Sequence, residues 1–357
     1  MKAIVWGAGG TAKEFFLRKI MNYKYDVVCL VDNNSDLWGK KRFGYDIVSP
    51  QDISDKDFDI IILCSVYYEE IKRQLKDLNI ESEKIITYQD IDNEICKCIV
   101  EKYQGSKDIE VRDTIKEFMK GSSSILGAYN PPFAIFSEVH RDDDGWPYIL
   151  FEGKKMYYPL KHIFALKNGK EVVADIMYEQ GEESPHRYLP KGYSMPNDAV
   201  IVDAGVCEGN FALRFADTAK KIYLIEADVE WMEALKRTFA PYNNKVEYIN
   251  KFLSGRDNSR EITLDNIVKG HLDFLKMDIE GAEVDALLGA KRVLTANNVQ
   301  CAVCSYHRQY DERYIQHILQ SYGYNTETSK GFIFFPYDEN LVVTHDYLRR
   351  GVVYGSK

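Results

Sequence analysis

The sequence predicts an α/β protein built from two Rossmann-like domains, and three observations lead to this fold class. The chain of 357 residues is too long for one ordinary core and long enough for two domains. Short apolar runs alternate with amphipathic helical segments in two separate parts of the chain. Each of these parts opens with a glycine-rich loop. Such alternation implies right-handed crossover connections and a mainly parallel sheet in each part.

The pattern along the chain predicts four consecutive parts. Residues 1–95 form the first Rossmann-like domain, and residues 96–126 form a charged helical connector. Residues 127–195 carry aromatic residues, prolines and glycines in alternating stretches, which predict a β-rich arm or lid and are compatible with a homodimer. Residues 196–357 form the second α/β domain. We expect its tail, GFIFFPYDENLVVTH, to be a closing antiparallel pair of strands.

Composition narrows the class of protein. The net charge of −9 argues against a dedicated nucleic-acid binder, because such proteins usually carry a basic face. No apolar run approaches the length of a membrane span. The seven cysteines are odd in number and lie mostly in apolar runs, which favours a reduced, cytoplasmic protein with buried thiols.

The first glycine-rich loop, GAGGTA, follows a strand and opens a helix. Gly7, Gly9 and Gly10 would allow close approach of a pyrophosphate, and Asp32 at the end of the next strand would accept bonds from ribose hydroxyls. This pattern predicts a nucleotide site, as in an oxidoreductase or a nucleotide-sugar-binding module. The alternative is a degenerate loop kept for packing or dimerisation. The segment VDNNSDLWGKKRFGYDIVSPQDI resembles nucleotide-sugar-associated Rossmann domains of bacterial polysaccharide-modifying proteins.

The second loop, DAGVCEG, places an acid before its glycines, and that acid changes the expected ligand. Asp203 would repel a pyrophosphate, whereas S-adenosylmethionine carries an ammonium and a sulfonium and no phosphate. Glu226 ends the next strand, where a carboxylate can bind a ribose diol. The predicted contacts of this cofactor are Asp203, Gly205, Glu208, Gly209, Asn210, Glu226, Ser254 and Asp278.

Several motifs of the second domain resemble those of the FkbM-family methyltransferases. They are IVDAGVCEGNFALRFA, YLIEAD, ITLDNI, FLKMDIEGAEVDALLGAKRVL and SYHR, and KMDIEGAE is the most specific. The resemblance implies a class I methyltransferase fold and methyl transfer from S-adenosylmethionine, usually to a hydroxyl of a sugar or natural product. This sequence departs from the family pattern at Cys207 and Glu208, where small or amide residues are commoner.

Polar residues end two neighbouring strands of the second domain. Asp278 closes one strand and His307 the next, so both should lie at the carboxyl edge of the sheet beside Glu280. His307 can act as the base for an acceptor hydroxyl. Alternatively, Asp278, Glu280 and His307 bind a divalent cation such as Mg²⁺ or Mn²⁺, which lowers the pKa of the hydroxyl. Glu283 is interpreted mainly as a charge favoured at a helix start.

The segment before the second domain supplies candidate acceptor contacts. His186, Arg187 and Tyr188 combine polar and aromatic groups, and Arg187 could bind an anionic acceptor, although a solvated loop explains them equally well. The sequence therefore predicts an O-methyltransferase acting on a hydroxyl of a sugar, as a small molecule or glycan, in a bacterial glycan or nucleotide-sugar pathway. Fold alone does not fix the substrate.

Overall fold

The computed structural model describes residues 1–22, 24–65, 67–121, 126–127, 136–174 and 179–357. The chain forms two compact units. Unit 1 consists of Met1–Ala128 and Phe334–Leu348, and unit 2 consists of Tyr129–Ile333 and Arg349–Lys357. The mixed α/β fold class agrees with the sequence. The predicted connector and arm include residues 122–125, 128–135 and 175–178, which lie outside the described residues.

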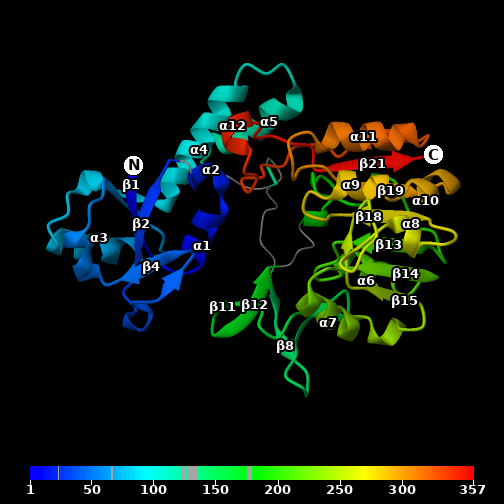
Figure 1. The fold of residues 1–357 in the computed structure, drawn as a ribbon, viewed down its shortest axis with the longest axis horizontal. Helices are drawn as coiled ribbons and strands as arrows, with labels where there is room; N and C mark the ends of the chain where they lie inside the picture. Colours follow the sequence, from blue (N-terminus) through cyan, green and yellow to red (C-terminus); the bar gives the residue numbers. More distant parts are fainter. Residues whose placement is uncertain (23, 66, 122–125, 128–135, 175–178) are drawn as a thin grey trace. The chain divides into compact units, whose positions relative to one another are not determined.

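Unit 1 is built on a six-stranded sheet with the order β3-β4-β2-β1-β5-β6 (Figure 1). The central strand β1 pairs in parallel with β2 and β5, and the short β3 pairs antiparallel with β4. The apolar residues of β1 are buried on both faces of the sheet, as expected of a parallel strand covered by helices. The strands are β1 Lys2–Trp6, β2 Asp26–Val31, β3 Lys41–Arg42, β4 Tyr45–Val48, β5 Ile60–Leu63 and β6 Ile85–Thr87.

Two helices of unit 1 begin at recognisable side-chain caps. Thr87 and Asp90 form a capping box at the start of α4, and the side chain of Asp108 accepts backbone N–H bonds at the start of α5. The helices α4 and α5 pack on each other and belong to unit 1, so the compact units divide the chain differently from the predicted boundary at residue 95. The helices are α1 Gly10–Leu17, α2 Lys19–Asn22, α3 Tyr68–Asp77, α4 Tyr88–Tyr103, α5 Ile109–Phe118 and α12 Leu341–Thr344.

The antiparallel pair of strands predicted in the tail is absent from residues 334–348. This segment holds the short helix α12 and no strand, and one isolated bridge joins the flanking residues Ile333 and Arg349. Its apolar residues instead pack within unit 1, where Phe334 meets the ring of Phe118 edge to face at 5.8 Å. The apolar side chains of this stretch are therefore explained by burial in the core of unit 1 and not by a strand.

Residues 136–174 form short antiparallel hairpins. One three-stranded sheet has the order β10-β9-β8 and the other has the order β11-β12-β7. The strands are β7 Phe136–Glu138, β8 His140–Arg141, β9 Pro147–Phe151, β10 Lys154–Tyr157, β11 Ala165–Lys167 and β12 Lys170–Ala174. The strand β10 packs against α7 of the same unit.

Unit 2 is built on a seven-stranded sheet with the order β15-β14-β13-β18-β19-β21-β20 (Figure 1). The strands from β15 to β19 are parallel, whereas β21 runs antiparallel between β19 and β20. The strand order reverses at β13, and ligands of such sheets bind at the carboxyl ends beside this reversal. The strands are β13 Val200–Ala204, β14 Lys221–Ile225, β15 Val246–Ile249, β18 Phe274–Met277, β19 Gln300–Cys304, β20 Asn325–Thr328 and β21 Val352–Ser356.

Helices and one small sheet complete unit 2. A core of buried aliphatic residues from β13, β18 and β19 and from α8 to α11 fills the space against the sheet. The helices are α6 Asn210–Phe215, α7 Val229–Thr238, α8 Leu264–Ile267, α9 Glu283–Leu288, α10 Lys291–Ala296 and α11 Asp311–Ser321. The strands β16 Phe252–Leu253 and β17 Glu261–Ile262 form the small sheet. Across the residues that the structure describes, no helix is long and apolar enough to cross a membrane.

Candidate active site

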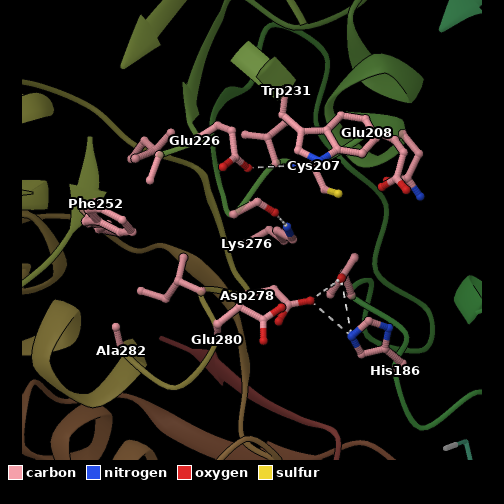
Figure 2. A pocket seen from close by; sticks show the side chains of 18 of the residues that line it. His186, Cys207, Glu208, Glu226, Trp231, Phe252, Lys276, Asp278, Glu280 and Ala282 are labelled. Atoms are coloured by element: carbon pink, nitrogen blue, oxygen red, sulfur yellow. Dashed lines mark hydrogen bonds and ion pairs between the residues drawn. The ribbon is translucent and has the colours of Figure 1, made fainter. Parts of the chain in front are cut away.

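A cavity of about 410 Å³ opens at the carboxyl edge of the unit 2 sheet (Figure 2). Its walls come from the loops after β13, β14, β15 and β18, together with residues 179–188. Of the residues predicted from the sequence, the lining includes Gly205, Glu208, Asn210, Glu226, Asp278, Glu280, His186 and Tyr188. The predicted residues Asp203, Gly209, Ser254, His307 and Arg187 are not part of this lining.

The two glycines of the second loop serve different needs. Gly205 has φ +70°, and an added Cβ would lie 1.6 Å from the carbonyl oxygen of Asp278, so only glycine allows β13 and β18 to end this close together. Gly209 has φ +83°, and an added Cβ would lie 2.8 Å from Leu235 in α7. Gly209 is therefore required for helix packing next to the cavity and does not border it.

Glu226 is held in place by backbone groups. Its Oε2 accepts a hydrogen bond from the N–H of Cys207 at 3.0 Å, and its Oε1 accepts one from the N–H of Asp228 at 2.9 Å. Figure 2 shows the first of these bonds at the top of the cavity. A carboxylate oxygen can accept more than one hydrogen bond, so both oxygens remain available to hydroxyl donors in the cavity.

Asp203 lies beneath the loop and pairs with a lysine that the sequence analysis missed. Lys276 Nζ lies 3.1 Å from Asp203 Oδ1, and both side chains are buried. The same Nζ donates to the carbonyl oxygens of Ala204 and Gly205. Asp203 thus fixes the loop through Lys276 and does not face a ligand. A lysine in the middle of the apolar strand FLKM was the available signal, because a buried lysine needs a buried acid.

Asp278 is the centre of the site. Tyr188 donates its hydroxyl to Oδ2 at 2.7 Å, and Nε2 of His186 lies 3.2 Å from the same oxygen. Nε2 of His307 lies 3.4 Å from Oδ1. Burial opposes ionisation of Asp278, but the bond from His186 and the charges of both imidazoles and Lys276 hold its pKa well below its ordinary value. Asp278 is therefore a stable carboxylate on the cavity wall.

His307 stands behind Asp278, backed by Glu283. Nδ1 of His307 lies 3.1 Å from Oε1 of Glu283, and that oxygen also accepts the N–H of Ile279 at 2.9 Å. Glu283 begins α9 as predicted, yet its side chain is fully buried, so a helix-start charge does not describe it. Burial lowers the pKa of His307, but the contact with Glu283 and the other nearby carboxylates raise it above its ordinary value.

Glu280 occupies the rim of the same cavity. Its side chain is 86% exposed, and Oε2 lies 3.7 Å from Nε2 of His307. The residue has φ +57° and precedes Gly281, where an added Cβ would lie 2.9 Å from Nε of Arg308. A tight turn between β18 and α9 thus directs Glu280 outward while Asp278 stays inside.

The segment before β13 contributes His186 and Tyr188 to the cavity. Nδ1 of His186 lies 3.5 Å from Oε2 of Glu179, so the imidazole bridges two carboxylates. Burial lowers the pKa of His186, but hydrogen bonds and charges from Asp278 and Glu179 outweigh it and raise the pKa to about 9. Arg187 instead lines a separate small cavity with Arg214 and donates Nε–H to the carbonyl of Leu189.

Ser254 lies in a neighbouring polar network. Its Oγ is 3.0 Å from Glu261 and 2.9 Å from Asp285. The residues just before it, Phe252 and Leu253, line the cavity instead. Ser254 therefore supports the strand pair β16–β17 beside the cavity.

The arrangement does not fit a cation held by Asp278, Glu280 and His307. Among the described residues, the donor atoms that approach within 4.8 Å are those of Asp278, His307 and Glu283, not Glu280. Asp278 and Glu283 face opposite nitrogens of the His307 ring, as two ion-pair partners of one imidazole do. A second group includes His186, Asp278 and Cys304. Burial raises the pKa of the Cys304 thiol, so Cys304 is a neutral thiol beside His186 and Asp278.

The first glycine loop, in unit 1, is held by Asp32 and packs against the backbone of Cys64. Gly7 has φ +117°, and an added Cβ would lie 2.3 Å from the carbonyl oxygen of Cys64. Asp32 accepts the N–H of Ala8 through Oδ2 and the N–H of Asn34 through Oδ1, both at 2.9 Å. Added Cβ atoms at Gly9 and Gly10 would meet nothing within 4 Å. Nucleotide binding here stays a prediction.

Comparisons with known proteins assign the class of the chain. The family profile of the methyltransferase FkbM domain matches residues 127–327, and the C2185-like, N-terminal profile matches residues 1–86. No curated protein matches the sequence. Together, the fold, the acid-lined cavity and these matches define an S-adenosylmethionine-dependent methyltransferase. The chain belongs to the FkbM methyltransferase family.

Solved structures of methyltransferases are similar at low sequence identity. The methyltransferase FkbM from Methylobacillus flagellatus KT is 14% identical over 99% of this chain and 89% of that chain, with a TM-score of 0.49. A putative methyltransferase from Streptococcus mutans in complex with SAH is 13% identical over 46% of this chain and 90% of that chain, with a TM-score of 0.31. The precorrin-6y C5,15-methyltransferase from Geobacter metallireducens GS-15 is 11% identical over 46% of this chain and 83% of that chain, with a TM-score of 0.32.

Proposed function

We propose that unit 2 is a class I methyltransferase that methylates a hydroxyl group of a sugar in a bacterial glycan or nucleotide-sugar pathway. The observation that carries the proposal is the position of Asp278, a carboxylate on the cavity wall held between two imidazoles. Such a group can bind a hydroxyl and take up its proton. The resemblance to FkbM-family enzymes supplies the sugar part of the proposal.

The residues around the cavity fit the cofactor. The glycine at position 205 opens the loop, and Glu226 presents a fixed carboxylate suited to ribose hydroxyls. Phe252 and Trp231 offer aromatic faces for the adenine ring. When bound, S-adenosylmethionine supplies an electrophilic methyl group on its sulfonium sulfur. Carboxylates on the cavity wall suit this cationic molecule.

We assign the roles of the residues by whether they line the cavity or contact a residue that does. Asp278 contacts the acceptor hydroxyl and accepts its proton as the new oxygen–methyl bond forms, because that bond makes the proton far more acidic than in the free hydroxyl. His186 and Tyr188 fix one oxygen of Asp278, and Tyr188 also borders the acceptor space. His307, which the sequence predicts as the base, acts through Asp278 because it does not line the cavity. Glu280 at the rim is placed to meet the acceptor as it enters.

The test is a transfer assay with isotope-labelled S-adenosylmethionine and mass spectrometry of the products. The acceptor panel contains nucleotide sugars and oligosaccharides, with catechols and small peptides as controls. We expect label on a sugar oxygen. Transfer only to a control acceptor would overturn the sugar assignment, and absence of S-adenosylhomocysteine binding in a thermal-shift measurement would overturn the cofactor site.

For unit 1, we propose a nucleotide site at the first glycine loop, with the open space beside Gly9 and Gly10 as its support. The site would suit a nucleotide sugar or a dinucleotide. Thermal shift with NADH and a nucleotide-sugar panel tests it separately from the methyltransferase activity. No shift with any of these ligands would contradict the site.

A further inference from the structure

Glu208 is a carboxylate on the cavity wall that forms no ion pair among the residues that the structure describes. It follows Cys207, a non-glycine residue with φ +49°, and this left-handed conformation shapes the loop that presents Glu208 to the cavity. Burial and the nearby charge of Glu179 raise the pKa of Glu208, although a hydrogen bond from Cys207 and the charge of Lys276 act in the opposite direction. A cation brought by a ligand would relieve this penalty.

The cationic side chains that line the cavity already have other partners. Lys276 is engaged by Asp203 and by loop carbonyls. Lys251 donates to the carbonyl of Asn258, and His186 bridges Asp278 and Glu179. Glu208 is therefore left without a direct ion pair among the described residues, although the charge of Lys276 acts on it from a distance. An unpaired carboxylate in a cavity is unusual.

The position of Glu208 relative to Glu226 indicates which part of a ligand it meets. Phe252 follows β15, Glu226 follows β14 and Glu208 follows β13, and these strands are adjacent in that order. Figure 2 likewise draws Phe252 and Glu208 on opposite sides of Glu226. A ligand whose ribose binds Glu226 and whose adenine packs on Phe252 therefore directs its other end toward Glu208.

We propose that Glu208 binds the α-ammonium group of the methionine part of S-adenosylmethionine. This inference rests on the cofactor site of the proposed function and adds a residue where the chain departs from the usual family loop. The ammonium donates to the Glu208 carboxylate, and such charge-assisted hydrogen bonds are stronger than neutral ones. Glu208 thereby fixes the amino-acid end of the cofactor and with it the position of the sulfur.

Isothermal titration calorimetry with two ligands tests this assignment. S-adenosylhomocysteine carries the α-ammonium, whereas 5′-methylthioadenosine keeps the adenosine and sulfur and lacks the amino-acid part. In Glu208→Gln, we expect the Kd of S-adenosylhomocysteine to rise about tenfold or more, and the Kd of 5′-methylthioadenosine to stay unchanged. Glu230→Gln, which removes an exposed carboxylate of α7, serves as the charge-matched control and should bind both ligands like the wild type.

Each other result overturns a distinct statement. Equal weakening of both ligands would show that Glu208 maintains the loop and does not read the ammonium. An unchanged Kd for S-adenosylhomocysteine, with a raised KM for the acceptor, would assign Glu208 to a cationic acceptor instead. Both results leave the cofactor site intact. Wild-type protein that binds neither ligand would overturn the cofactor site itself.

Discussion

Nδ1 of His307 lies 3.1 Å from Oε1 of Glu283, and both side chains are buried and are not part of the cavity lining. This pair fixes the orientation of the imidazole, so that its other nitrogen faces Asp278. Glu283 thus acts on Asp278, the proposed catalytic carboxylate, through the imidazole of His307. Substitution of His307 or Glu283 should therefore affect Asp278 in the cavity, although neither residue lines the cavity.

Asp278→Asn should abolish most of the turnover. The substitution keeps the size of the side chain but removes the proton acceptor, so we expect a rate loss of about 10²- to 10⁴-fold. The Kd of S-adenosylhomocysteine should change by less than about threefold, because the loop contacts remain. Initial rates and calorimetry measure the two quantities. Glu247→Gln, an exposed residue of β15, is the control for normal activity, and wild-type rates in Asp278→Asn would refute the role.

Glu283→Gln should destabilise unit 2 because it leaves the raised-pKa imidazole of His307 without its charged partner. We expect a loss of about 1–3 kcal/mol in the free energy of unfolding. Glu233→Gln removes an exposed carboxylate that pairs with Lys236, and its effect should stay within about 0.5 kcal/mol. Urea unfolding compares both variants with the wild type. Equal stability of the two variants would mean that the buried pair contributes little.

Stability should depend on pH through His186. Its pKa is raised from an ordinary value of 6.5 to about 9, so the imidazolium stabilises the fold fully below the lower value. This contribution is lost as the pH rises from about 6.5 through about 9. We expect the free energy of unfolding to fall across that window in the wild type and to fall less in His186→Gln. Parallel curves for the two proteins would contradict the prediction.

Removal of divalent cations should leave turnover unchanged. The carboxylates of Asp278 and Glu283 face opposite nitrogens of His307, an arrangement that suits ion pairs and not a shared metal ligand set. Rates are to be compared after dialysis against EDTA and after addition of Mg²⁺ or Mn²⁺. A loss of activity with EDTA that either cation restores would revive the metal hypothesis.

Local sequence patterns predict the cavity residues that directly follow a strand. Gly205, Glu226 and Asp278 follow strands that the sequence marks clearly, and the parallel order brings their ends together. Partners across long sequence separations were harder to predict. His186 reaches Asp278 from a segment without regular periodicity, and Ser254 belongs to a network whose other members lie on α9 and β17.

Burial accounts for the remaining differences. A charge pattern does not show whether an acid at a helix start faces water or the interior, so Glu283 was assigned to the helix dipole while its side chain is buried beside His307. The same limit applies to the tail at 334–348, where apolar residues resemble a strand but pack within unit 1. In both cases the deciding interactions come from elements distant in sequence.

The strand β21 lies between β19 and β20 although it comes last in the chain order, and residues 334–348 complete unit 1 from an equally late position. During synthesis from the N-terminus, the edge of β19 must therefore wait, unpaired, until residues 352–356 leave the ribosome. Unit 1 likewise waits for Phe334, which meets Phe118 in its interior. A chain stopped at residue 333 would leave both cores open, so the two units should reach their final packing only after residues 334–356 have been synthesised.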